Sequence, residues 1–183
     1  MFQSFANKLT VSRILVIPAI LLLLAVPHGW AAWLALVLFS AAGATDWLDG
    51  YMARRENQVT KIGQFLDPVA DKLLVSAVIL VLVATRQISG FSVLPAVIIL
   101  LREVAVSGLR EFLADLRVSV PVSRLAKWKT TLQLVALGFL IVGRYAPSSI
   151  PATTIGDFGI WVAGVITVIT AWDYWRASLK HFD

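Results

Sequence analysis

The stretch from residue 46 to residue 71 reads DWLDGYMARRENQVTKIGQFLDPVAD and joins two apolar segments of the chain. It carries four aspartates: Asp46, Asp49, Asp67 and Asp71. An ionised carboxylate in or beside hydrocarbon is costly unless a counter-ion lies near it. Four carboxylates need more positive charge than one arginine supplies, and one or two divalent metal ions would supply it.

The spacing within this stretch is helical. The first half places its carboxylates and small residues in steps of three and four, which share one face of a helix: Asp46, Asp49, Gly50 and Ala53. The second half repeats every four residues on another helix face: Gly63, Asp67 and Asp71. We therefore expect two helices that each direct two carboxylates into one cleft. Carboxylate oxygens are hard ligands, which favours Mg²⁺ or Mn²⁺, with two ions expected, over zinc.

The composition indicates a membrane protein. Of the 183 residues, 58% are hydrophobic and only 15% are charged, and the mean hydropathy is +0.81. A soluble domain of this length would carry more charge. The net charge of +5 could indicate a nucleic-acid partner in a soluble protein. Here the basic residues bracket apolar segments, which is typical of topology signals and contacts with anionic membrane lipids, so we expect no nucleic acid.

Six apolar blocks have about the length that a helix needs to cross a bilayer. They cover residues 12–27, 30–52, 63–85, 91–114, 126–144 and 154–175. We expect an all-α integral membrane protein with six transmembrane helices in one bundle. The whole chain, 1–183, is expected to form a single membrane domain with a short N-terminal cytoplasmic segment, 1–11.

The distribution of charge predicts the orientation of these spans. If the N-terminus is cytoplasmic, only Arg86 and Arg144 of the sixteen basic residues lie on the far side. Basic residues gather on the cytoplasmic side of membrane proteins, so both termini are expected there. Of the eleven acidic residues, only Asp157 falls on the far side. The motif carboxylates are therefore expected near the cytoplasmic boundary of a multi-pass protein of the cytoplasmic (inner) membrane, in a site that opens to the cytoplasm.

The pattern Asp-x2-Asp-Gly-x2-Ala-Arg-x8-Gly-x3-Asp-x3-Asp over residues 46–71 resembles the signature of the CDP-alcohol phosphatidyltransferases. The resemblance implies a six-helix membrane bundle, usually a homodimer. It also implies transfer of a phosphatidyl group from CDP-diacylglycerol to an alcohol, with release of CMP.

Residue roles follow from the same resemblance, position by position. Asp46, Asp49 and Asp67 would hold the metal ions, and Asp71 would complete the metal site and take the proton of the attacking hydroxyl. The positions that match contacts with the CDP part of the donor are Gly50, Arg54 and Thr60. An N-terminal run that resembles the family's nucleotide pocket adds three more: Asn7, Thr10 and Arg13.

A second, basic stretch bears on the acceptor alcohol. Its cations fall at the cytoplasmic ends of the fourth and fifth blocks, where a phosphate-bearing acceptor would need them. The pattern Arg-Glu, Arg-Glu, Lys-x-Lys-Thr-Thr resembles the branch of the family that uses glycerol 3-phosphate. The residues expected to bind its phosphate are Arg102, Arg110, Lys127 and Lys129.

The surroundings of Glu103 leave an alternative open. Arg102 lies within an apolar block and needs a partner. We expect no contact between Arg102 and Glu103, because adjacent helix residues point in different directions. Glu103 and Arg110 are seven residues apart and share a face. They could form a structural pair with each other rather than bind the substrate.

Two other functions remain open. The same chemistry could serve another acceptor, such as serine, inositol phosphate or phosphatidylglycerol. A more distant alternative is a cation transporter, because carboxylates inside a membrane can bind and pass a cation. The far halves of the first, fourth and sixth blocks are almost purely apolar, which disfavours a cation path.

Overall fold

A computed structural model describes residues 5–56, 61–116, 118 and 124–179. This part of the chain forms six α-helices and two short 3₁₀ turns. The helices are α1 (Phe5–Ala25), α2 (Gly29–Glu56), α3 (Lys61–Ala84), α4 (Val93–Asp115), α5 (Arg124–Val142) and α6 (Ala152–Leu179). The 3₁₀ turns are Gly90–Ser92 before α4 and Gly143–Tyr145 after α5. The prediction of an all-α chain with six helices is confirmed for the described residues.

The helices end where the sequence has turn-forming residues. The backbone turns at Pro27 and His28, and the amides of Ala31 and Ala32 donate to the carbonyl of His28 at the start of α2. Gly90 and Gly143 have positive φ, which glycine adopts without steric cost. The helices also run past the apolar blocks: α1 begins at Phe5, so residues 5–11, expected as a segment before the first span, are helical.

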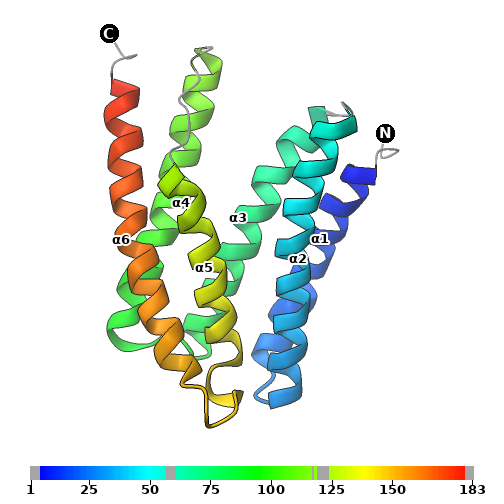
Figure 1. The fold of residues 1–183 in the computed structure, drawn as a ribbon, viewed down its shortest axis with the longest axis vertical. Coiled ribbons are helices and arrows are strands. Elements are labelled where there is room, and N and C mark those ends of the chain that lie inside the picture. The colour runs from blue at the N-terminus through cyan, green and yellow to red at the C-terminus, as the bar shows by residue number, and fades with distance from the viewer. Residues whose placement is uncertain (1–4, 57–60, 117, 119–123, 180–183) are drawn as a thin grey trace.

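The six helices form two groups of three (Figure 1). In one group α1 packs against both α2 and α3, and in the other α6 packs against both α4 and α5. Contacts between α2 and α5 join the groups. All six helices contribute to one apolar core: Ile20, Leu24, Phe39, Leu74, Val78, Leu82, Ile99, Leu137, Leu140 and Ile160 are among its buried residues.

Glycines let α6 approach its neighbours closely. A Cβ atom at Gly159 would lie 2.7 Å from Cβ of Ala136 on α5, and one at Gly164 would lie 2.8 Å from Cβ of Pro95 on α4. Small residues at helix contacts are common in membrane proteins, where close packing holds helices together. These contacts position α4 and α5, the two helices that carry the second basic stretch.

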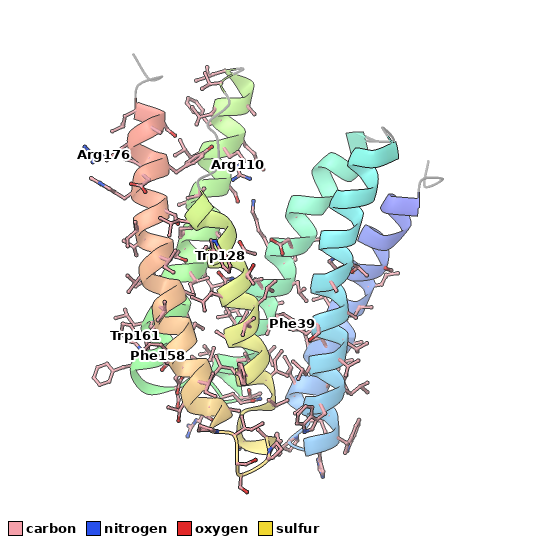
Figure 2. All side chains as sticks on the ribbon, in the orientation of Figure 1. Phe39, Arg110, Trp128, Phe158, Trp161 and Arg176 are labelled. Atoms are coloured by element: carbon pink, nitrogen blue, oxygen red, sulfur yellow. The ribbon has the colours of Figure 1, made fainter. Side chains whose placement is uncertain are left out.

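The outer surface of the bundle is apolar. Large side chains such as Leu22, Val104 and Phe158 are 70–74% exposed, and Phe158 projects away from α6 in Figure 2. Water would disfavour so much exposed apolar surface, and lipid would not. By length and composition, the helical stretches Gly90–Ala114 and Ala152–Leu179 can each cross a membrane, and Ser12–Ala25 and Gly29–Thr45 are shorter apolar stretches. These features support a membrane protein; the six spans and the orientation of the termini stay predictions.

Candidate active site

A polar cavity of about 180 Å³ lies between α3, α4 and α5. Its lining has nine polar or charged residues and two valines: Asp71, Lys72, Val75, Arg102, Glu103, Val106, Ser107, Arg110, Lys129, Thr130 and Gln133. The structure thus brings Asp71 of the aspartate motif together with three residues predicted to bind the acceptor phosphate. Those residues are 31 or more positions away from Asp71 along the chain.

Each helix contributes one face to this cavity. On α4 the lining residues follow steps of three and four from Glu103 to Arg110, and on α5 Gln133 lies one turn after Lys129. On α3, Asp71 and Val75 repeat at four. The helical period of the sequence therefore explains why these residues of each helix share a face, and the packing of the helices decides that the three faces meet.

Lys129 is almost completely buried and forms an ion pair with Glu103 across the α4–α5 contact. Arg102 Nη1 lies 3.3 Å from the same Oε1 atom of Glu103. One carboxylate is therefore shared by two cations. A buried ammonium needs such a partner, because an unpaired charge away from water is costly.

One expectation about Glu103 is wrong, and the alternative that it pairs with Arg110 is not found in the described chain. Arg102 and Glu103 do contact each other, although they are adjacent on α4. The arginine side chain is long enough for its Nη1 to donate to Oε1 of Glu103, 3.3 Å away. The partners of Glu103 in the described chain are Lys129 and Arg102, and no pair with Arg110 forms there. The guanidinium of Arg110 instead lies 6.0 Å from the centre of the Tyr174 ring on α6, within cation–π range.

The charged residues that line the cavity have a net charge of +2. Its cations are Lys72, Arg102, Arg110 and Lys129, and its carboxylates are Asp71 and Glu103. Arg110 is exposed on the upper part of α4 (Figure 2). A cavity of this size and sign suits a small anion, and it is smaller than the roughly 300–1,000 Å³ of a site for a drug-sized ligand.

Five lining residues with polar or charged side chains were not among the predicted site residues: Lys72, Glu103, Ser107, Thr130 and Gln133. The hydroxyl of Ser107 donates to the backbone carbonyl of Glu103, 2.6 Å away. Gln133 is 3% exposed, and within the described part of the chain its Oε1 has no hydrogen-bond partner. The position of Gln133, four residues after Lys129 inside an apolar segment, was the one sequence signal that could have identified it.

Most residues of the aspartate motif and the predicted donor site have side chains outside the described part of the structure. The helix assignments are Asn7, Thr10 and Arg13 in α1, Asp46, Asp49, Gly50 and Arg54 in α2, Asp67 in α3, and Lys127 in α5. Arg13 has a described side chain, which is buried. Thr60 lies outside the described residues altogether.

The fit of a metal ion can be judged from the donor set. Where side chains are described, no three histidine, cysteine, aspartate or glutamate residues cluster, and of the four motif aspartates only Asp71 belongs to that part. Asp71 lines the polar cavity, and Asp67 precedes it by one turn of α3. Four oxygen-donating carboxylates fit Mg²⁺ or Mn²⁺.

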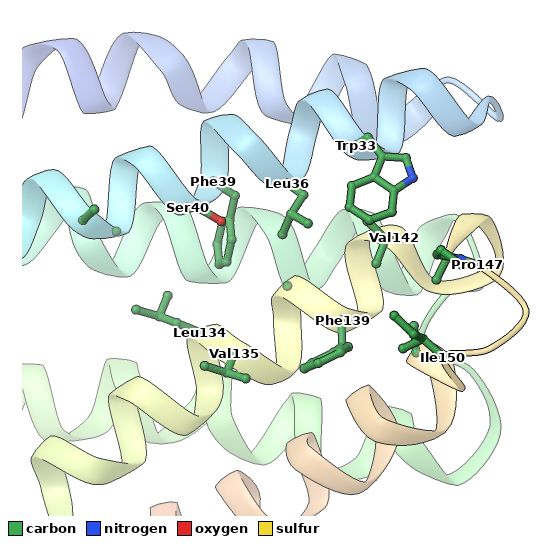
Figure 3. Close-up of a pocket in the computed structure, with 15 residues that line it drawn as sticks. Trp33, Leu36, Phe39, Ser40, Leu134, Val135, Phe139, Val142, Pro147 and Ile150 are labelled. Carbon is green, nitrogen blue, oxygen red and sulfur yellow. The ribbon is translucent and has the colours of Figure 1, made fainter.

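A larger cavity, of about 410 Å³, lies between α2, α5 and the start of α6. Figure 3 shows its apolar side chains, with Trp33, Leu36 and Phe39 on one wall and Leu134 and Phe139 on the other. None of its described lining residues is ionisable. The lining that the structure describes can take up apolar groups but offers no group for acid–base chemistry.

Comparison with known proteins places the chain in a family. The model of the CDP-alcohol phosphatidyltransferase family matches residues 3–172, and the chain belongs to this family. A protein of Rickettsia felis is 44% identical over 180 residues, covering 98% of both chains. A protein of Pseudomonas fluorescens is 42% identical over 182 residues, covering 98% of this chain and 92% of that one. One of Cereibacter sphaeroides is 37% identical over 213 residues, covering 97% and 96%. All three are named CDP-diacylglycerol–glycerol-3-phosphate 3-phosphatidyltransferase.

Proposed function

We propose that this protein transfers the phosphatidyl group of CDP-diacylglycerol to glycerol 3-phosphate. The products are phosphatidylglycerophosphate and CMP, so the protein would be a phosphatidylglycerophosphate synthase of phospholipid biosynthesis. The observation that carries the proposal is the polar cavity, which joins Asp71 of the family motif to Arg102, Arg110 and Lys129. The names of the relatives that match almost the full chain support the same acceptor.

The phosphate of the acceptor binds to the basic side of the cavity. A phosphate monoester carries about −1.5 to −2 charges at neutral pH, which matches the two positive charges in excess there. Arg110 is exposed and can meet the incoming phosphate, whereas Lys129 is held in place by Glu103. Guanidinium groups bind phosphate through paired hydrogen bonds, so Arg102 and Arg110 also orient the acceptor. Lys127, one turn before Thr131 on α5, is the fourth proposed contact.

Asp71 accepts the proton of the terminal hydroxyl of glycerol 3-phosphate. The oxygen of that hydroxyl attacks the lipid-linked phosphorus of the donor, and the bond from that phosphorus to CMP breaks. Two Mg²⁺ or Mn²⁺ ions, held by Asp46, Asp49, Asp67 and Asp71, would neutralise the donor diphosphate. The proposed donor contacts are Asn7, Thr10, Arg13, Gly50, Arg54 and Thr60. The narrow cavity limits access of water, which would compete with the acceptor hydroxyl.

The proposal includes a location. The chain forms one domain that crosses the cytoplasmic membrane six times, with both termini and the active site on the cytoplasmic side. The distribution of lysine and arginine supports this orientation, and the ends of α2, α3, α4 and α5 that hold the motif and the basic stretch lie at the same end of the bundle as both termini (Figure 1). A homodimer is proposed from the family resemblance.

The test is release of CMP by purified protein with CDP-diacylglycerol and Mg²⁺ or Mn²⁺. Glycerol 3-phosphate, serine, inositol phosphate and phosphatidylglycerol are supplied in parallel reactions. We expect release with glycerol 3-phosphate only. Release with another alcohol would keep the metal chemistry and contradict the assignment of the basic cavity. If folded protein released no CMP with any acceptor, the transporter alternative would gain support, and cation flux in proteoliposomes would be measured next.

A further inference from the structure

Gln133 occupies an unusual position in the polar cavity. It lines the cavity from α5, one helical turn deeper in the bundle than Lys129, and its side chain is 3% exposed. Its Oε1 has no hydrogen-bond partner among the side chains and backbone that the structure describes. A buried carbonyl oxygen without a donor costs free energy, so a ligand in the cavity that carries a hydroxyl group would find an acceptor there.

The cations near Gln133 have other partners. Lys129 Nζ and Arg102 Nη1 both contact the carboxylate of Glu103, and the buried Nε of Arg102 makes no hydrogen bond with Gln133 or with any other described residue. The phosphate of the acceptor cannot serve as the donor, because a phosphate dianion carries no hydrogen. The remaining donors in glycerol 3-phosphate are its two hydroxyl groups. The terminal hydroxyl gives its proton to Asp71 in the proposed reaction, which leaves the middle hydroxyl in need of an acceptor.

The geometry allows this contact. Gln133 lies four residues from Lys129, about 6 Å along the helix axis, so a molecule whose phosphate meets Lys129 can extend its glycerol backbone towards Gln133. The terminal torsion of a glutamine side chain has a broad energy minimum, so the amide can turn its oxygen towards an incoming hydroxyl at little cost.

We propose that Oε1 of Gln133 accepts a hydrogen bond from the middle hydroxyl of the acceptor, and that Gln133 thereby selects acceptors with a hydroxyl next to the reacting carbon. The inference rests on the proposed function, because it needs glycerol 3-phosphate in the cavity. It adds a residue that distinguishes glycerol 3-phosphate from other small phosphate-bearing alcohols. Arginine and lysine contacts to the phosphate alone cannot make this distinction.

The test compares glycerol 3-phosphate with 3-hydroxypropyl phosphate, which lacks only the middle hydroxyl. The value of kcat/KM for each acceptor is measured in the wild type, in Gln133→Leu and in Gln133→Glu. We expect the wild type to prefer glycerol 3-phosphate by about tenfold or more. Gln133→Leu is similar in size but lacks an acceptor oxygen. It should lose this preference, because its kcat/KM falls for glycerol 3-phosphate and not for 3-hydroxypropyl phosphate. Gln133→Glu keeps an acceptor oxygen and should retain the preference, with a higher KM for both anions.

Gln87→Leu is the matched control. It is the same substitution at a half-buried glutamine beside Arg144, at the opposite end of the bundle, and it should leave the ratio between the two acceptors unchanged. An equal loss for both acceptors in Gln133→Leu would show a structural role and overturn the inference, as would a wild type that does not distinguish them. Failure of the wild type with glycerol 3-phosphate itself would overturn the proposed function and this inference together.

Discussion

Asp71 is the motif aspartate whose side chain lines the same cavity as the basic residues of α4 and α5. A carboxylate in this position can take the proton of a hydroxyl only if the acceptor lies beside it, and in the proposed function Arg102, Arg110 and Lys129 would hold a phosphate-bearing acceptor there. The proposed proton acceptor and the proposed anion site thus line one small cavity.

Asp71→Asn should reduce turnover by at least 10²–10⁴-fold, the usual contribution of a positioned base, while the protein still binds CDP-diacylglycerol. The amide keeps the shape of the carboxylate but takes no proton. Steady-state CMP release and binding of the donor are the two measurements. Asp173→Asn makes the same change on the exposed surface of α6 and should keep full activity. Turnover close to the wild-type rate in Asp71→Asn would refute the role of this residue as the base.

Glu103→Gln should lower the free energy of unfolding by about 1.5–3 kcal/mol, because it removes the carboxylate with which the buried ammonium of Lys129 is paired. Removing that ammonium as well, in Glu103→Gln with Lys129→Met, should restore most of the lost stability. Thermal unfolding in detergent, followed by circular dichroism, measures both effects. Glu111→Gln, on the exposed side of α4, is the control and should change little. If the double variant is no more stable than Glu103→Gln alone, the destabilisation does not come from the unpaired ammonium of Lys129.

At the scale of the elements, α6 supports the two helices that carry the basic residues. It packs against α5 through Gly159 and against α4 through Gly164 and Tyr174. The ring of Tyr174 also faces the guanidinium of Arg110. The arrangement of α4 and α5 around the cavity therefore depends on the close approach of a helix that contributes no residue to the lining.

Gly159→Ala should destabilise the protein by about 1–3 kcal/mol, the usual cost of overpacking. Its new methyl group would lie 2.7 Å from Cβ of Ala136 and 3.4 Å from Cα, and neither atom can move away without moving α5. The KM for glycerol 3-phosphate should rise as well, since Lys129 and Gln133 lie on the displaced helix. Gly108→Ala on α4 meets nothing within 4 Å and is the control; replacing a helical glycine there should be neutral or stabilising. Equal melting temperatures for the two variants would contradict the close-packing argument.

At the scale of the whole molecule, charge and apolar surface divide the bundle along its length. Arg86 and Arg144 lie at the end that is predicted to face away from the cytoplasm, where Arg144 Nη2 donates to the carbonyl of Thr85, 3.3 Å away. The polar cavity draws on the opposite halves of α3, α4 and α5. Apolar side chains cover the outside between the two ends.

The predicted orientation can be tested with single cysteines, because the natural chain has none. Ser149→Cys, in the exposed loop before α6, should react in intact cells with a maleimide that does not cross membranes. Leu116→Cys, exposed at the end of α4, should react only after the cells are made permeable. The reverse pattern would place the active site on the outer side, and labelling of both positions in intact cells would contradict a membrane-spanning bundle.

Much of the fold could be predicted from the sequence. The apolar blocks and the turn residues between them predicted six helices, because helix length and helix breaks depend on local composition. The helix ends were less accurate: α1 begins at Phe5, since polar residues such as Asn7 and Lys8 can continue a helix beyond its apolar part. The spacing of the aspartates predicted shared faces and a family, and the model of that family matches residues 3–172.

The class of fold and the family could be predicted without a structure, because both depend on residues that are near one another in the chain. The pairing of Glu103 with Lys129, 26 residues away, and the position of Gln133 in the same cavity become visible only in the packed bundle. The helical period shows which residues of one helix lie together. It does not show which face of another helix will meet them, because that depends on how all six helices pack.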